Sequence, residues 1–229
     1  IEFLIQGGTV QRIADPDEDI FYFNSKDKIR LNIYKNIFVH HFVIPSLIAL
    51  KLKQGVKTRE KLLEDILFFD NLFRYEFMFP RAYDFTVAIN TMISFSLDRG
   101  LITENDGELY PNPDKDNELS LLANILQPFL ESFYVAIKVL TSKKVSFPQD
   151  ADKLVDLFRD NHQKYLLLGK VNSLEGNLTI SYKNIIRFFT EEKIILSTRG
   201  KGKKTMIRKD ERFLSIHDLY KKLFPKMGV

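Results

Sequence analysis

The feature that most constrains the fold is an uncharged run at positions 36–50, which is flanked by Lys35 and Lys51. This run favours one long helix over positions 31–53, ended by Gly55. Spanning a bilayer takes about 20 predominantly apolar residues, whereas this run is shorter and contains two histidines and a proline. We therefore expect a core or docking helix rather than a membrane span.

The aromatic composition indicates a folded domain with a substantial core. The 229 residues include 20 phenylalanines and 9 tyrosines, and aromatic side chains bury a large area each. There is no cysteine, which excludes disulfides, thiolate nucleophiles and thiolate-bound metals. The net charge of +4 favours acidic partners only weakly.

Helical periodicity dominates the middle of the chain. Positions 59–77 place apolar residues on one face, and Thr58 and Asp84 are predicted N-caps. A long helix over positions 116–141 is expected to kink at Pro128, which removes one backbone donor.

Two short hairpins are predicted beside these helices. The first pairs positions 101–103 with 108–110 around an Asn-Asp-Gly turn, and the second pairs 193–198 with 204–209. The predicted fold class is therefore mostly α with short β-hairpins, a helical scaffold carrying two winged-helix-like helix-plus-hairpin units.

The chain is expected to divide into three segments. Residues 1–28 are predicted to form short strands and turns at the cut edge of an upstream domain. Residues 29–112 form a helical unit with the first hairpin. Residues 113–229 form a long-helix unit with the second hairpin and a C-terminal helix.

Further predictions concern where elements begin. The alternation at positions 1–5 predicts a strand, and positions 21–23 and 29–33 predict a hairpin. Ser146 and Ser181 are predicted to begin helices.

Histidines and one glutamate are the candidate buried polar groups. The four histidines lack the spacing of a metal site, and His40 and His41 are expected on different helix faces. We favour a buried, hydrogen-bonded imidazole for His40 over a catalytic role. Glu131 lies in an apolar stretch, where a carboxylate must be paired or accept several hydrogen bonds. The hypothesis is an ion pair with Lys35, His40 or an arginine.

The second hairpin, called the basic hairpin below, carries six cations within eleven residues: Arg199, Lys201, Lys203, Lys204, Arg208 and Lys209. They are candidates for contact with lipid headgroups, at about 1 kcal/mol per cation. An acidic carrier protein or DNA phosphates would suit the same charges. A solvated hairpin without a partner is equally open.

Two segments of the chain together match a known pattern. The second runs from Leu126 to Glu131, and the first contains, in order, Tyr34, Lys35, Asn36, His40, Pro45 and Ser46. With the helix and hairpin between them, these segments resemble the region of the glycerol-3-phosphate acyltransferases downstream of the acyltransferase domain. Ile37 departs from the family, which often has asparagine there, so it receives no polar role.

The resemblance implies what the parent protein does. Such enzymes transfer a fatty acyl group from acyl-CoA or acyl carrier protein to glycerol 3-phosphate, which opens phospholipid synthesis. Their chemistry uses a His-x-x-x-x-Asp motif. In this chain the fifth residues after the histidines are Pro45, Ser46, Leu167 and Lys222, so no catalytic residue is transferred.

We therefore expect a C-terminal accessory domain, catalytically incomplete alone, which packs on an upstream acyltransferase domain at the cytoplasmic face of a membrane. Phe38, Phe42 and Ile44 mark the expected docking face. No cofactor and no metal are expected. The alternatives are a protein-interaction scaffold and a winged-helix nucleic-acid-binding regulator, which the few cations on the helix before the basic hairpin disfavour.

Overall fold

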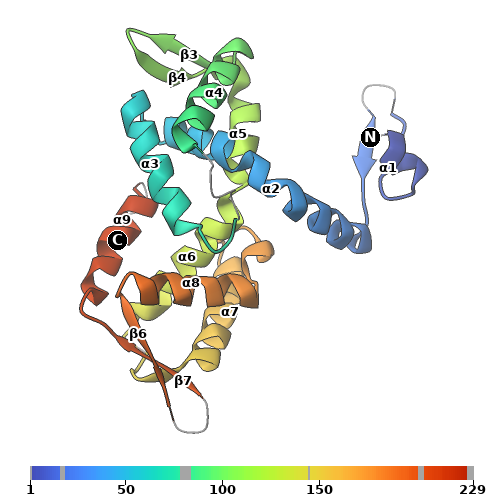
Figure 1. Ribbon diagram of the computed structural model, residues 1–229. Helices are drawn as coiled ribbons and strands as arrows, with labels where there is room; N and C mark the ends of the chain where they lie inside the picture. Colours follow the sequence, from blue (N-terminus) through green and yellow to red (C-terminus); the bar gives the residue numbers. More distant parts are fainter. Residues whose placement is uncertain (1, 16–18, 78–83, 144, 201–203, 226–229) are drawn as a thin grey trace. The chain divides into compact units, whose positions relative to one another are not determined.

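The computed structural model describes residues 2–15, 19–77, 84–143, 145–200 and 204–225, and only the backbone of residues 25, 26 and 28–37. It contains two compact units, Ile1–Phe42 and Val43–Val229. Helices dominate, with short antiparallel strands between them (Figure 1). The predicted fold class, mostly α with short hairpins, is confirmed.

The first unit begins with a helix where a strand was predicted. Glu2–Gln6 form α1, because backbone hydrogen bonds close a helical turn, including Gly7 N–H to the carbonyl of Phe3 (3.0 Å). The strands β1 (Gln11–Ile13) and β2 (Ile20–Tyr22) follow and pair antiparallel.

The long helix α2 (Ser25–Lys53) starts earlier than predicted. The side chain of Asn24 accepts a hydrogen bond from the backbone N–H of Asp27 (3.0 Å), and such a cap begins a helix. Positions 29–33 therefore lie inside α2, and the predicted pairing of 21–23 with 29–33 is wrong.

The second unit contains the end of α2 and most of the remaining elements. In chain order these are α3 (Arg59–Leu72), α4 (Phe85–Asp98), β3 (Ile102–Asn105), β4 (Glu108–Pro111), η1 (Pro113–Lys115), α5 (Asp116–Asn124), α6 (Gln127–Leu140), β5 (Gln149–Asp150), α7 (Ala151–Leu167), η2 (Leu174–Gly176), α8 (Thr179–Glu191), β6 (Ile195–Arg199), β7 (Thr205–Lys209), η4 (Phe213–Ser215) and α9 (Ile216–Leu223).

Two of the predicted caps are confirmed. Thr58 accepts from the N–H of Lys61 (3.3 Å) and Asp84 from the N–H of Val87 (3.0 Å). Gly55 follows α2 with a φ of 97°, a backbone conformation that suits glycine.

Two other caps were predicted wrongly. Asp150, rather than Ser146, caps α7, accepting from the N–H groups of Asp152 and Lys153. Ser181 is buried inside α8, whose N-cap is Leu178. Ser181 therefore lies in the first turn of the helix, where its buried side chain donates a hydrogen bond to Glu76 Oε2 (3.4 Å) instead of capping.

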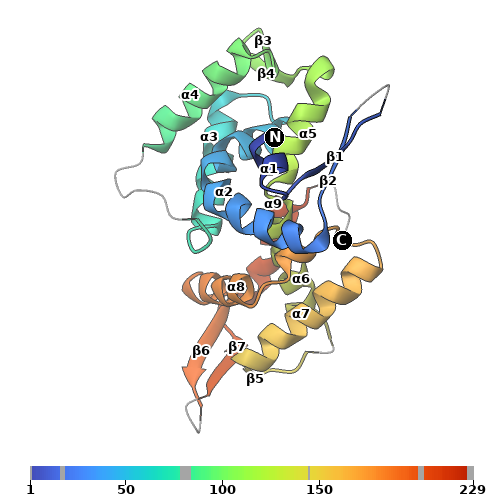
Figure 2. The same ribbon diagram turned by 90° about the vertical axis from the view of Figure 1, so that its right-hand side faces the viewer.

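The two hairpins differ in their partners. Asp106 and Gly107, with φ of 51° and 77°, form the two-residue turn that joins β3 to β4. The basic hairpin, β6 and β7, gains a third strand, β5, in the order β5-β7-β6 (Figure 2). The winged-helix likeness of these units and the boundaries after residues 28 and 112 remain predictions.

The long helix predicted over positions 116–141 is broken rather than kinked. It consists of α5 and α6, and Pro128 lies in the first turn of α6, where its missing N–H costs nothing. Of the helices in the described ranges, none is by itself long and apolar enough to cross a bilayer. The pair 113–124 and 127–140 reaches that length and composition only together, with a bend of 55°.

Phenylalanines build the centre of the second unit. The ring of Phe133 on α6 lies edge-on to Phe73, Phe188 and Phe189, with centroids 5.8 to 6.1 Å apart. Such edge-to-face pairs add to the burial of the rings themselves. They join α6, α8 and the end of α3 in one core.

Candidate functional site

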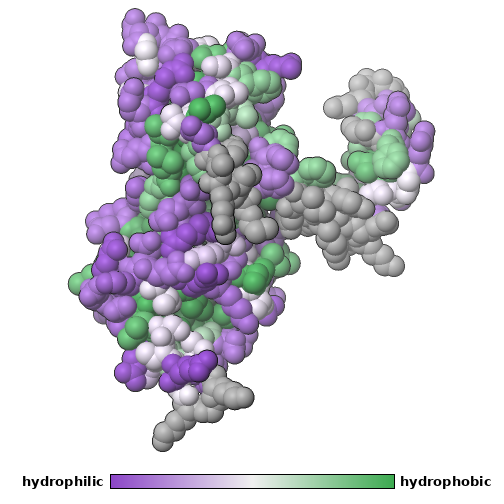
Figure 3. Space-filling model, in the orientation of Figure 1, coloured by the Kyte–Doolittle hydropathy of each residue, from purple (hydrophilic) through white to green (hydrophobic). Residues whose placement is uncertain are grey.

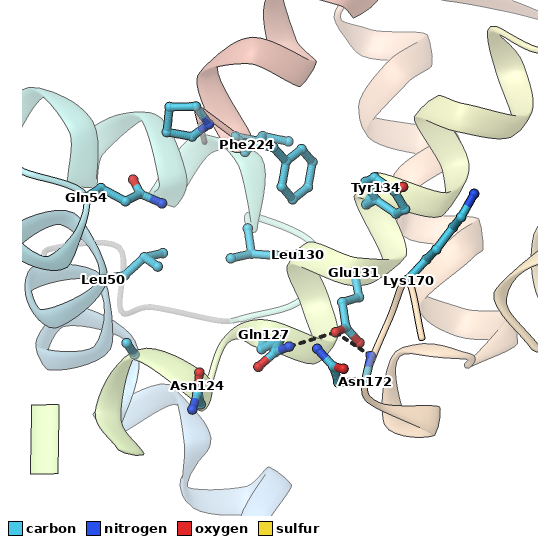
Figure 4. A pocket seen from close by; sticks show the side chains of 13 residues that line it. Leu50, Gln54, Asn124, Gln127, Leu130, Glu131, Tyr134, Lys170, Asn172 and Phe224 are labelled. Carbon is cyan, nitrogen blue, oxygen red and sulfur yellow. Dashed lines mark hydrogen bonds between the residues drawn. The ribbon is translucent and has the colours of Figure 1, made fainter. Parts of the chain in front are cut away.

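A pocket of about 310 Å³ lies where α2, the α5–α6 bend, the loop at positions 170–172 and the end of α9 meet (Figure 4). Its apolar wall consists of Leu50, Ala123, Leu130, Leu223, Phe224 and Pro225. The second segment of the family pattern supplies Gln127, Leu130 and Glu131 to the pocket, whereas the lining on α2, Leu50 and Gln54, lies beyond the first segment.

Polar groups line the rest of the pocket. They are Gln54, Asn124, Gln127, Glu131, Tyr134, Lys170 and Asn172. Figure 4 shows Leu50 and Gln54 on one side and Tyr134 and Lys170 on the other. One acid and one base among these residues leave the lining without net charge.

Glu131 is the buried charge of this site, with 7% of its surface exposed. Its Oε1 accepts hydrogen bonds from Gln127 Nε2 (2.8 Å) and from the backbone N–H of Asn172 (2.8 Å). Its Oε2 accepts from the backbone N–H of Ser173 (2.9 Å). Hydrogen bonds to the ionised form stabilise a buried carboxylate.

The hypothesis of an ion pair at Glu131 therefore needs correction. Within the described part of the chain, amide N–H groups rather than a cation satisfy this carboxylate. The side chain of Lys35 lies outside the described residues. The loop at 172–173 takes the place expected for an arginine or for His40.

Two further side chains hold the same loop. Ser132 Oγ donates to the carbonyl of Gly176 (2.7 Å), and His162 Nε2 donates to the carbonyl of Ser173 (2.7 Å). A Cβ at Gly176 would overlap the carbonyl oxygen of Pro128 and crowd both side chains. The loop after α7 is therefore fixed against α6 by several hydrogen bonds and by close packing.

His162 is the buried imidazole of this protein, and the sequence interpretation missed it. It is fully buried, and its Nδ1 lies 2.7 Å from the hydroxyl of Tyr182. Because Nε2 faces a carbonyl, the ring carries its proton there and Nδ1 accepts from the tyrosine. Burial, followed by the charge of Glu131, raises the pKa of Tyr182, which keeps its hydroxyl a donor. The spacing Val155, Phe158, His162 along one face of α7 was the signal for burial.

The first family segment forms part of α2, but it does not form a site with His40 at its centre. His40 is half-buried and His41 exposed, so the expected buried imidazole at His40 was wrong. Their ring centroids lie 3.9 Å apart, so the two rings are in contact although the residues are adjacent in the helix. The side chains of Tyr34, Lys35 and Asn36 lie outside the described residues.

Pro45 and Ser46 lie inside the second unit. Pro45 is accommodated within α2. Ser46 is fully buried, and its hydroxyl has no hydrogen-bond partner. This is a small buried residue where the helix packs, and nothing in its surroundings gives it a chemical role.

A second buried carboxylate, Asp65 on α3, is paired with a cation that the sequence interpretation did not single out. Lys51 is 3% exposed, and its Nζ lies 3.4 Å from Asp65 Oδ2 and 4.9 Å from the centroid of the Phe69 ring. Burial lowers the pKa of Lys51, and the charge of Asp65 opposes that shift. The exposed Lys61 pairs with the other oxygen of Asp65 (3.2 Å).

The described cations of the basic hairpin point to solvent or to aromatic rings. Arg199, Lys204 and Arg208 are exposed and pair with no carboxylate in the described ranges. Lys209 Nζ lies 4.5 Å from the centroid of the Phe213 ring. Lys201 and Lys203 lie outside the described residues. No cluster of three metal-binding side chains occurs in the described parts of the chain.

Comparison with known proteins places this geometry in context. A family model described as the glycerol-3-phosphate acyltransferase C-terminal region matches residues 1–198. A glycerol-3-phosphate acyltransferase of Shewanella baltica is 26% identical over 131 residues, 57% of this chain and 16% of that protein. For those of Shewanella amazonensis and Shewanella loihica the identities are 26% and 28%, over 76% and 70% of this chain. These two matches cover 21% and 19% of the relatives, so the chain spans about a fifth of their length.

Proposed function

The chain belongs to the family of glycerol-3-phosphate acyltransferase C-terminal regions, and from this premise we propose that it is an accessory domain that packs on the acyltransferase domain of such an enzyme. Acyl transfer to glycerol 3-phosphate then belongs to the whole enzyme. Because no His-x-x-x-x-Asp pattern occurs in this sequence, the general base is assigned to the other domain. The role of this chain is to support that domain and its contact with the membrane.

Exposed apolar side chains in the first unit carry the proposal. Eight large apolar residues of this unit are between 43% and 83% exposed: Phe3, Ile13, Ile20, Phe21, Tyr22, Phe23, Phe38 and Phe42. Figure 3 shows hydrophobic side chains at the surface of this unit, coloured green. Burying one such side chain stabilises a complex by about 1.5–3 kcal/mol, and exposed apolar patches mark interaction sites. Ile44, expected on the same face, is instead 5% exposed and belongs to the core.

Co-purification of this chain with the acyltransferase domain of its own parent enzyme tests the proposal. We expect the two to associate. The double variant F21D/F23D should lose that association, because it places two carboxylates on the exposed apolar surface of the first unit. The matched control is F95D, a charge placed on an equally exposed phenylalanine of α4 (48%).

Failure of the wild-type chain to associate would contradict the proposal. Equal loss of association in F21D/F23D and F95D would also contradict it, because the effect would not be specific to the first unit. A melting curve for each variant shows whether the second unit stays folded.

We further propose that the basic hairpin contacts the anionic surface of the membrane at which this enzyme acts. The support is three exposed cations, Arg199, Lys204 and Arg208, without a carboxylate partner among the described residues. Each such cation near an anionic surface contributes about 1 kcal/mol, and salt screens that contribution.

Sedimentation with vesicles containing phosphatidylserine tests this contact. The variant K204E/R208E is expected to lower vesicle binding at low salt, whereas K153E, a charge reversal at an exposed position of α7, leaves it nearly unchanged. If both variants bind like the wild type, or if binding persists at high salt, the hairpin is not the membrane contact.

A further inference from the structure

Within the described residues, three helices, α1, α4 and α8, end in the same way and are each followed by a hairpin (Figure 1). At each end, three successive backbone N–H groups donate to carbonyls four, three and five residues earlier. These donors are Gly7, Gly8 and Thr9; Arg99, Gly100 and Leu101; and Glu192, Lys193 and Ile194. The middle residue of each set has a positive φ, of 67°, 63° and 56°. Such helix endings are common, so only a likeness that extends into the hairpins is informative.

The hairpins that follow these endings share one register. On the second strand, the residue opposite the fourth position after the positive-φ residue is Phe21, Leu109 or Ile207. The three positive-φ residues are spaced by 92 and 93 residues. The described part of the chain therefore contains three helix–hairpin modules, and Phe21 holds in the first module the position that Leu109 and Ile207 hold in the second and third.

In the second and third modules, a further segment pairs with the strand that carries this position. The backbone N–H of Leu109 donates to the carbonyl of Lys57 (2.8 Å), and Gln149 of β5 pairs with Ile207. Lys57 and Gln149 hold equivalent places, because each directly precedes the N-cap residue of the helix that follows, α3 or α7. Each of these modules thus runs extended segment, helix, helix, hairpin, and the first part pairs with the last.

The first module lacks this third segment among the described residues. Its sheet consists of β1 and β2, and a two-stranded ribbon alone is at best marginally stable in water. Leu109 and Ile207 are both 0% exposed, whereas Phe21 is 44% exposed. The outer edge of β2 and the ring of Phe21 are therefore open where the other two modules are covered.

The second and third modules also give the place of the missing segment in the polypeptide. Lys57 precedes Gly100 by 43 residues. Gln149 precedes Lys193 by 44 residues. The same interval, counted back from Gly8, falls about 36 residues ahead of the first residue of this chain.

We propose that the outer edge of β2 pairs at Phe21 with an extended segment of the parent polypeptide at this place, and that the helix after this segment covers the Phe21 ring. Adding a strand to an open sheet edge is a common mode of recognition. The matching family model describes a C-terminal region, which agrees with a segment ahead of this chain. This inference rests on the docking proposed above, since it names the part of the enzyme that covers the first unit.

Photo-crosslinking in the whole parent enzyme tests the proposal. Phe21→p-benzoylphenylalanine places a photoreactive ring at the open position, and peptide mapping identifies the segment that it joins. We expect an intramolecular cross-link to the stretch about 20–40 residues ahead of this chain, which spans the expected segment and its helix. The matched control is Tyr22→p-benzoylphenylalanine. Tyr22 is 43% exposed but points to the opposite face of β2, so it should join this stretch several-fold less.

Amide hydrogen exchange on the unmodified protein tests the backbone pairing separately, because the larger ring can disturb the packing around it. The N–H of Phe21 should exchange at least about tenfold more slowly in the whole enzyme than in this chain alone, since only the whole enzyme supplies a partner strand.

Three results would overturn the proposal. The first is a cross-link from position 21 to a second copy of the protein or to a more distant part of the enzyme; in the latter case docking stands and only the segment is wrong. The second is exchange at Phe21 that is as fast in the whole enzyme as in this chain. The third is an equal cross-link yield from positions 21 and 22. Conversely, a cross-link to the expected stretch without co-purification of the separate acyltransferase domain would support this inference and contradict the accessory role.

Discussion

Two regions of the second unit bury a carboxylate almost equally, yet they satisfy its charge in different ways. Asp65 on α3 is 5% exposed and Glu131 on α6 is 7% exposed. The first is paired with the ammonium groups of Lys51 and Lys61. The second is held by one side-chain amide and by the backbone N–H groups of Asn172 and Ser173.

The two arrangements depend on different parts of the chain. At Asp65 two charges are buried together, and removing one leaves the other without a partner. At Glu131 the donors are mostly backbone groups, which no substitution other than proline removes, so the loop itself must be in place. The first region depends on a pair of side chains and the second on the path of the chain.

The largest effect is expected from breaking the ion pair. D65A leaves the buried ammonium of Lys51 unpaired and should lower the free energy of unfolding by about 3–5 kcal/mol, measured by urea denaturation. The double variant K51M/D65L should recover most of this loss, because it removes both charges. The control K61A removes only the exposed partner and should cost less than about 1 kcal/mol. A mild D65A would show that Lys51 is satisfied in another way.

A smaller effect is expected at the carboxylate held by amides. E131Q keeps one acceptor oxygen but points an NH₂ group at a backbone N–H, which should cost about 1–3 kcal/mol. Hydrogen exchange should accelerate at Asn172 and Ser173 more than in α8, because the loop loses its anchor. An equal acceleration across α8 would contradict a local role.

The smallest effect is expected at Glu76, whose carboxylate is only half-buried. Burial raises its pKa, although Asn184 and Ser181 donate to it. A folded state with a raised carboxyl pKa holds its proton more tightly than the unfolded chain. Its stability contribution is therefore complete below the unfolded pKa, near 4.5, and is lost as the pH rises through the folded pKa.

The variant E76Q should remove this pH dependence. Its free energy of unfolding should match that of the wild type near pH 4 and exceed it at neutral pH by no more than about 1 kcal/mol. The measurement is urea denaturation across that range. A wild type that gains stability relative to E76Q as the pH rises would reverse the sign of the argument.

Local signals in the sequence were sufficient for much of the fold. Thr58 and Asp84 cap helices as predicted, and the Asn-Asp-Gly turn joins β3 to β4. The family resemblance, inferred from two short segments, is confirmed over residues 1–198. These features depend on neighbours within a few residues, which a single sequence displays.

Predictions failed where a distant part of the chain decides, or where one local signal outweighed another. The alternation of residues 1–5 gives no strand, because a strand needs a partner that this segment does not have among the described residues. The pattern at 29–33 suited a strand as well, but the cap at Asn24 placed it in α2. Ser181 was predicted to cap a helix, but its side chain is buried and donates a hydrogen bond to the distant Glu76.

The sequence by itself determined the helical class, the positions of the two hairpins in the second unit and the family, since periodicity, turn residues and short motifs are local. Only the tertiary structure decided how the buried polar groups are satisfied. His162, rather than His40, became the buried imidazole, and Glu131 found backbone donors 41 and 42 residues away. The pocket also exists only in the fold, because α2, α6 and α9 form its wall from opposite ends of the second unit. Burial and hydrogen bonding depend on which segments meet, and a linear pattern does not contain that information.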